Sequence, residues 1–83
     1  MPLREIRDHA KVIGTNQVNK ALAKGQDHKV YLARDAESHI TDPIRNLCQQ
    51  KGIAVEMVDT MESLGKACGI EVGAAAVALI HSQ

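Results

Sequence analysis

The residues best suited to chemistry form one short run near the start of the chain, Gly14-Thr15-Asn16-Gln17-Val18-Asn19-Lys20. This run opens an apolar pattern typical of a helix, so the unpaired N–H groups of the first turn would point outward and outline an anion site. Asn16 and Gln17 lie within one helical turn of Lys20, so amide and ammonium groups would share a face suited to purine edges and phosphates. An ordinary solvated first turn with Thr15 as its cap is the alternative, and the spacing leaves both interpretations open.

A second run, Gly69-Ile70-Glu71-Val72-Gly73, places aliphatic side chains in what should be a surface loop. Ile70 and Val72 can pack there against a flat apolar surface such as an unstacked base. The alternative is that one or both fold back onto the end of the preceding helix. The sequence does not decide between these arrangements.

Other reactive side chains do not form recognisable sites. The histidines are scattered, and structural zinc needs four convergent ligands, so we expect no metal and no cofactor. Cys48 and Cys68 lie on predicted apolar helix faces without a C-x-x-C spacing, which favours reduced, buried thiols over nucleophiles. Arg34-Asp35 follows a predicted strand and can form an acid or clamp, but no second carboxylate accompanies it. Neither a P-loop nor a dinucleotide-binding glycine pattern occurs, and we predict no catalytic residues and no enzyme activity.

The composition predicts one domain over residues 1–83, because 9.0 kDa is too small for two cores. One Tyr and no Phe or Trp leave an aliphatic core and remove any aromatic platform for stacking single-stranded bases. The longest apolar run, Val72 to Ile80, cannot span a bilayer, and the start of the chain has no apolar signal segment. We therefore expect a cytoplasmic protein with no membrane partner.

The charges cancel overall but are unevenly distributed. Residues 1–34 carry seven basic against three acidic side chains, a balance of +4, and residues 35–83 carry −4. A neutral total can therefore conceal a basic face that steers an acidic partner, although such charges also simply solvate helices.

Glycines and caps divide the chain into alternating helices and strands. Apolar spacing predicts a short first helix on Leu3, Ile6 and Ala10. Strands are expected at 11–13, 29–33, 53–58 and 74–80, and the strand at 29–33 should be covered on both faces. Between the first two strands we expect a helix capped by Thr15 and ended by Gly25. The next helix should have Asp42 as N-cap and Pro43 as its first residue and should run up to Gly52, with a buried stripe of Ile40, Ile44, Leu47 and Cys48. The last helix should run from Thr60 to Gly69 with Met61, Leu64 and Cys68 on one side.

This order predicts an α/β fold, a three-layer α-β-α sandwich around a four-stranded, mostly parallel (mixed) sheet. Ligands of such sheets meet the carboxyl ends of strands and the amino ends of the following helices. Both chemical runs fall at such positions, so we expect them to converge into one surface.

Four blocks of the chain resemble the ribosomal L-seven-Ae/L-thirty-e family, in the same order and over nearly the whole length. They are Gly14 to Leu22, Val30 to Asp35, Leu47-Cys48, and the run from Leu64 to Ala76 that contains the uncommon L-G-x-A-C-G-I-E-V pattern. The sequence looks most similar to small bacterial members of the YbxF type.

The resemblance implies the L-thirty-e-like fold and binding of kink-turns, RNA motifs with tandem sheared G·A pairs and a three-nucleotide bulge. It assigns guanine edges to Asn16, Gln17 and Lys20, close backbone approach to Gly14 and Thr15, and bulged bases to the loop of Ile70, Glu71, Val72 and Gly73. We add Arg34 to the expected RNA-binding residues. The partner would be ribosomal RNA or riboswitch-like leader RNA, with the ribosome as a candidate assembly, and nothing in the sequence demands more than a monomer.

Two other functions stay open on the sequence. The chain can be a ribosome-associated protein-interaction module that does not read RNA, with the loop at 70–72 as a protein contact. An enzyme using Asp35 or Cys68 is the third alternative.

Overall fold

The computed structural model describes residues 10–80. Its elements are β1 (Lys11–Ile13), α2 (Thr15–Lys24), β2 (Asp27–Ala33), α3 (Ser38–Lys51), β3 (Ala54–Val58), α4 (Met61–Ala67) and β4 (Ala76–Ile80). Each element predicted between residues 11 and 80 is present. The predicted first helix falls, apart from Ala10, outside the described residues.

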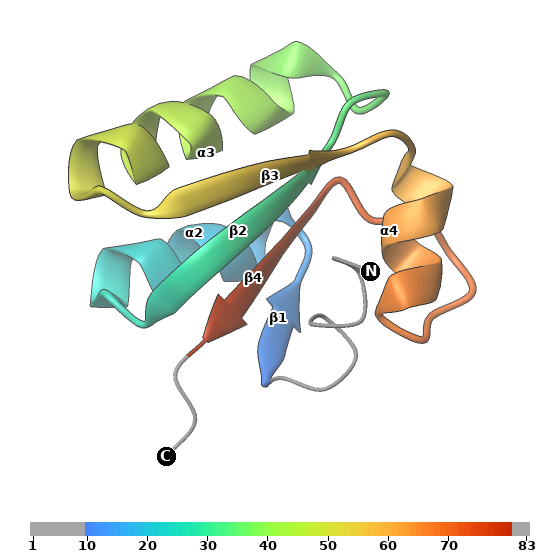
Figure 1. Ribbon diagram of the computed structural model, residues 1–83, viewed down its shortest axis with the longest axis horizontal. Coiled ribbons are helices and arrows are strands. Elements are labelled where there is room, and N and C mark those ends of the chain that lie inside the picture. The colour runs from blue at the N-terminus through green and yellow to red at the C-terminus, as the bar shows by residue number, and fades with distance from the viewer. Residues whose placement is uncertain (1–9, 81–83) are drawn as a thin grey trace.

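The four strands form one mixed sheet in the order β1-β4-β2-β3 (Figure 1). β2 pairs with β3 in parallel, and β4 pairs antiparallel with both β1 and β2. β1, β2 and β3 therefore run in one direction and β4 runs opposite between two of them. The mixed sheet is confirmed, but parallel pairing, predicted to dominate, is confined to β2 and β3.

The path through α4 explains the reversed strand. The backbone N–H of Ala74 donates to the carbonyl of Met61 at 3.0 Å, so the chain returns to the first turn of α4 before β4 begins. β4 thus starts at the end of the sheet where β3 stopped. A parallel strand would need a crossover to the other end of the sheet.

Helices cover both faces of the sheet, which confirms the α/β class and the three layers (Figure 1). On one face, Val18 and Leu22 of α2 and Ile44 and Cys48 of α3 pack against inward side chains of β2 and β4. On the other face, Leu64 of α4 packs in a second cluster with residues of β2, β3 and β4. Burying both faces of the central strands fixes the positions of the strand ends.

The start of α3 differs from the prediction. The helix begins at Ser38 after Glu37, so Asp42 is not the N-cap and Pro43 lies inside the helix. Proline removes one backbone hydrogen bond there, but packing holds the helix together on both sides of it, with Thr41 and Ile44 buried. With this register Thr41 takes the inward position expected for Ile40, which is 36% exposed.

No helix between residues 10 and 80 is long and apolar enough to cross a membrane.

Candidate nucleic-acid interface

Four chain segments meet at one end of the sheet, where the strands begin or stop. β1, β2 and β3 end there and β4 begins there, as three backbone hydrogen bonds show: Gly14 N–H donates to Ala76 O at 2.9 Å, Ala33 N–H to Ala75 O at 3.0 Å, and Arg34 N–H to Val58 O at 2.7 Å. We call this end of the sheet the strand-end surface. It comprises residues 14–20, 34–36, 59–61 and 70–75. The two runs singled out by the sequence are therefore neighbours through the backbone.

Gly14 turns the chain from β1 into α2. Its φ of 98° and ψ of 151° belong to a region that is essentially restricted to glycine. Gly14 is also the N-cap of α2, which makes Thr15 the first helical residue and corrects the predicted cap. The side chain of Thr15 is not needed to start the helix because the glycine conformation already ends the strand and because Val18 N–H donates to Gly14 O at 3.0 Å.

The amino end of α2 is open. No side chain caps it, and the first turn contains no acidic residue. Its leading N–H groups and the positive end of the helix dipole therefore face outward, an arrangement that favours an anion.

The three polar residues predicted for guanine edges are all exposed on α2. Val18, Ala21 and Leu22 are buried against the sheet and fix the rotation of the helix. Asn16 and Lys20, four residues apart, consequently share its exposed face, with Gln17 beside them in the first turn. The amides can donate and accept hydrogen bonds, and the ammonium can donate to a phosphate or a guanine.

The loop before β4 treats its two aliphatic side chains differently. Ile70 is partly buried and packs against the core cluster of α4, whereas the Val72 side chain is exposed, with 70% of the residue accessible. Ile70 therefore folds back onto the helix end, and Val72 is available for an apolar contact, so each of the two arrangements left open by the sequence holds for one residue. Glu71 and Gly73 are exposed beside Val72. The loop thus presents one apolar side chain on a support made by the other.

Two glycines let this loop lie directly on α4. A Cβ at Gly65 would overlap the carbonyl oxygen of Val72, and a Cβ at Gly73 would lie 3.0 Å from the Cβ of Met61. Gly65 itself is buried. The backbone of the loop therefore approaches the helix more closely than any other residue at these positions would allow.

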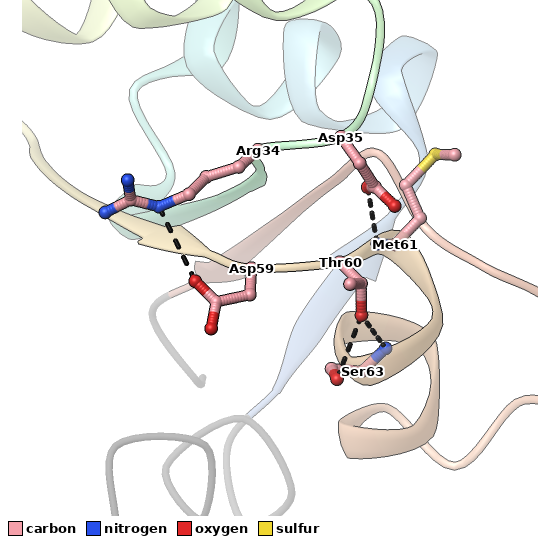
Figure 2. A network of polar contacts seen from close by, with 6 residues as sticks. All are labelled: Arg34, Asp35, Asp59, Thr60, Met61 and Ser63. Atoms are coloured by element: carbon pink, nitrogen blue, oxygen red, sulfur yellow. Dashed lines mark hydrogen bonds and ion pairs between the residues drawn. The ribbon is translucent and has the colours of Figure 1, made fainter.

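A polar network holds the other half of the strand-end surface (Figure 2). Arg34 and Asp35 reach different partners at the β3–α4 junction: Arg34 Nε lies 3.7 Å from Asp59 Oδ1, and Asp35 Oδ1 accepts the backbone N–H of Met61 at 2.8 Å. Thr60 Oγ1 accepts the backbone N–H of Ser63 at 3.0 Å, which makes Thr60 the N-cap of α4 at the predicted start of the helix.

The charge of this surface is mixed. Lys20 and Arg34 accompany Asp35, Asp59 and Glu71. Lys29, counted in the basic half of the sequence, lies at the other end of β2, where its Nζ is 3.1 Å from Glu56 Oε1. Among the described residues of the first half, the basic side chains therefore do not gather into one face. A phosphate contact at the strand-end surface depends on few cations and on the open helix end.

The thiols are not activated. Burial, followed by the charge of Asp27, raises the pKa of Cys48 to about 11. Burial also raises the pKa of Cys68, against a smaller lowering by Lys11. A raised pKa reduces the thiolate needed for nucleophilic attack. Among residues 10–80, no three His, Cys, Asp or Glu side chains are placed to hold a metal ion.

Sequence reasoning missed the residues that support the loop. The sequence predicts Asp35 only as an acid or clamp, and it marks Gly65 only as part of the family-like run. A glycine inside a helix is a usable signal of close packing. The bond from Met61 to Asp35 joins residues 26 positions apart, and no local pattern reports it.

Known proteins match this chain along most of its length. The sequence matches the model of the ribosomal protein L7Ae/L30e/S12e/Gadd45 family over residues 3–83. An RNA-binding protein of Bacillus pumilus is 48% identical over 69 residues, covering 83% of this chain and 84% of that protein. The RNA-binding protein YbxF of Geobacillus stearothermophilus is 44% identical over 70 residues, covering 84% and 85%.

The fold is also found among solved structures. A 15.5kD RNA binding protein of Giardia lamblia superimposes with a TM-score of 0.91 over 99% of this chain and 72% of its own, at 22% identity. At that identity the likeness concerns the fold alone.

Proposed function

Because this chain belongs to the ribosomal protein L7Ae/L30e/S12e/Gadd45 family, we propose that it is an RNA-binding protein that recognises and stabilises kink-turns in ribosomal or structured leader RNA. Relatives at 44–48% identity over most of the chain are named RNA-binding proteins, and the chain is not an enzyme. The ribosome is a candidate assembly, the cytoplasm the expected location, and a monomer the expected state.

The observation that best supports this proposal is the hydrogen bond from Gly14 to Ala76, because it places the open end of α2 beside the start of β4, three residues after the 70–73 loop. Regular A-form RNA hides its base edges in a deep, narrow groove. A kink-turn exposes guanine edges beside a sharply bent backbone and an unstacked bulge. The strand-end surface offers a matching group for each of these features.

Each part of the surface has a distinct role in the proposal. The leading N–H groups of α2 would receive a phosphate, and Asn16, Gln17 and Lys20 would read guanine edges. Val72, supported by Ile70, would cover an unstacked base of the bulge. Arg34 would contribute a cation near the backbone once its exposed pair with Asp59 rearranges.

Binding would favour the bent RNA by population shift, since a ligand that prefers one conformer draws the equilibrium toward it. The test uses two fluorescently labelled RNAs, a kink-turn and the same strand lengths with the G·A pairs replaced by Watson–Crick pairs. We expect tight binding and a bending signal only with the kink-turn. Equal affinity for both RNAs contradicts the proposal.

A protein-contact role for the loop is tested with the same RNAs. Val72→Ser should weaken kink-turn binding by about fivefold, since an aromatic side chain stacked on a base contributes about 1–3 kcal/mol and an aliphatic contact falls at the low end of that range. Val72 is preferable to Ile70 here because its exposed side chain can be changed without disturbing the core. Unchanged RNA affinity in Val72→Ser would favour the protein contact.

A further inference from the structure

We propose that Asp35 is a positioning residue for RNA recognition: it holds α4, and through α4 the 70–73 loop, by accepting the backbone N–H of Met61. This inference rests on the proposed function. It gives a role to a carboxylate that no catalytic site uses.

Met61 is the junction through which Asp35 acts. Its N–H donates to Asp35 Oδ1 at 2.8 Å (Figure 2). Its carbonyl accepts the N–H of Ala74 at 3.0 Å. Its Cβ faces Gly73, where no side chain would fit without displacement. One residue therefore connects the β2–α3 loop, the first turn of α4 and the segment that leads into β4.

Besides the packing of Ile70 against the core, the 70–73 loop is held by backbone contacts to α4. The N–H of Ile70 donates to Gly65 O at 3.1 Å, and the carbonyl of Val72 lies against Gly65. Both contacts are made to α4 itself, so they move the loop together with the helix. The bond from Asp35 connects α4 and the 70–73 loop to the end of β2. β2 pairs with β4, and Ala76 of β4 accepts the N–H of Gly14 at the start of α2. In this proposal, the bond to Asp35 therefore helps to set the position of Val72 relative to α2.

A charge argument separates positioning from a direct electrostatic effect. Removing a carboxylate from a surface that binds RNA should, by charge alone, maintain or strengthen binding. A positioning role predicts instead that removing the Asp35 carboxylate weakens RNA binding. Asp59 provides the matched control because it lies on the same surface, pairs with Arg34, and has no bond to α4 among the described contacts.

We therefore expect Asp35→Ala to weaken kink-turn binding by about fivefold, the loss typical of one hydrogen bond. Asp59→Ala should bind equally or more tightly. Asp35→Asn, whose amide oxygen still accepts the Met61 N–H, should stay within about twofold of the parent. If Asp35→Ala tightens binding as Asp59→Ala does, or if Asp35→Asn loses as much as Asp35→Ala, the assignment is overturned.

A double-mutant cycle with Val72 tests the route of the effect. If Asp35 acts through the loop, Asp35→Ala combined with Val72→Ser should lose about as much affinity as Val72→Ser alone, because the apolar contact is already gone. If the affinity loss of the double variant equals the product of the two single-variant fold losses, Asp35 acts elsewhere and the proposal is overturned. Should Asp35→Ala fail to fold, Asp35→Glu, which keeps the charge and shifts the carboxylate, takes its place in the cycle.

Amide hydrogen exchange in the free protein makes the test independent of RNA. In Asp35→Ala, the amides of Ile70 and Ala74 should exchange faster, while that of Val18, which bonds to Gly14, should not change. Unchanged exchange at both loop amides overturns positioning even if kink-turn discrimination stands. Faster exchange in a protein that binds both RNAs equally would instead leave positioning intact and refute the proposed function.

Discussion

At the amino end of α4, Thr60 accepts the N–H of Ser63, Asp35 accepts that of Met61, and Glu62 adds a negative charge in the first turn. At the amino end of α2 there is neither a side-chain cap nor an acid. Both ends lie on the strand-end surface. The leading N–H groups and the helix dipole are therefore satisfied within the protein at the start of α4, where they contribute to stability, and remain available to a ligand at the start of α2.

α3 shows that the difference is not simply the presence of a cap. Its amino end also lacks a side-chain cap, but Glu37 occupies the N-cap position and its carboxylate lies 3.2 Å from His39 Nδ1. Among the three helices that the structure describes, α2 alone has neither a cap nor an acidic residue at its start. An anion is best accommodated where the protein supplies no negative charge of its own.

Replacing Gly14 should have the largest effect on the open end. Gly14→Ala forces alanine into a glycine-only conformation at a cost of about 1–3 kcal/mol, although the added Cβ meets no atom within 4 Å. We also expect at least tenfold weaker kink-turn binding, because relieving the strain reorients the first turn. Urea unfolding and RNA titration measure the two effects.

Gly25→Ala is the control for this substitution, since Gly25 ends the same helix with a φ of 69° and equal space for a Cβ. It should cost about 1–2 kcal/mol of stability and leave RNA affinity unchanged. If both variants lose the same affinity, the effect of Gly14→Ala is one of global stability and not of the α2 start.

Closing the open end with a charge should separate stability from binding. Asn16→Asp places a carboxylate in the first turn of α2, which should stabilise the fold by about 0.3–1 kcal/mol through the helix dipole. Kink-turn binding should weaken by about 1–3 kcal/mol, because an amide donor is lost where a bidentate base contact is proposed. Thermal unfolding and Kd measurements at one salt concentration provide both numbers.

Asn19→Asp adds the same charge to an exposed position of the same helix that is outside the predicted contact set. Its affinity should change less than threefold. Equal losses in the two variants would mean that any negative charge on α2 repels RNA and that Asn16 has no specific role.

Opening the closed end is the reciprocal experiment. Thr60→Ala removes the cap of α4 and should cost about 1 kcal/mol of stability. RNA affinity should remain within about twofold, since the bond from Met61 to Asp35 persists. An affinity loss as large as that of Asn16→Asp would show that the α4 end also contributes to binding and would remove the contrast between the two helices.

Elements with complete local signals could be predicted from the sequence. The apolar spacing of Val18 and Leu22 and the glycine at its end define α2: its end at Gly25 agrees with the prediction, and its start differs by one residue because Gly14 is the N-cap. The start of α3 was predicted wrongly because Asp42-Pro43 is a strong local signal for a first turn. Packing of Thr41 against the core outweighs that signal, and no local rule weighs the two.

The candidate site divides in the same way. Exposure of Asn16 and Lys20 follows from helical periodicity, whereas the different fates of Ile70 and Val72 depend on where the loop meets α4. Periodicity cannot apply to a loop, and the contact that decides its path is made by Gly65. The antiparallel course of β4 likewise follows from a bond between Ala74 and α4 rather than from the strand's own residues.

The smallest effect in the comparison concerns one cation beside the open end. Lys20→Ala should weaken kink-turn binding by a few fold and reduce the slope of log K against log salt by about 0.7–0.9, the loss of one phosphate contact. Lys24, one turn further along α2, serves as the control because it stands in the last turn, where it complements the opposite end of the dipole. Lys24→Ala should therefore lower stability by a few tenths of a kcal/mol and leave the salt slope unchanged. Titrations at several salt concentrations distinguish the two lysines, and identical slopes in both variants would place the phosphate contact away from the start of α2.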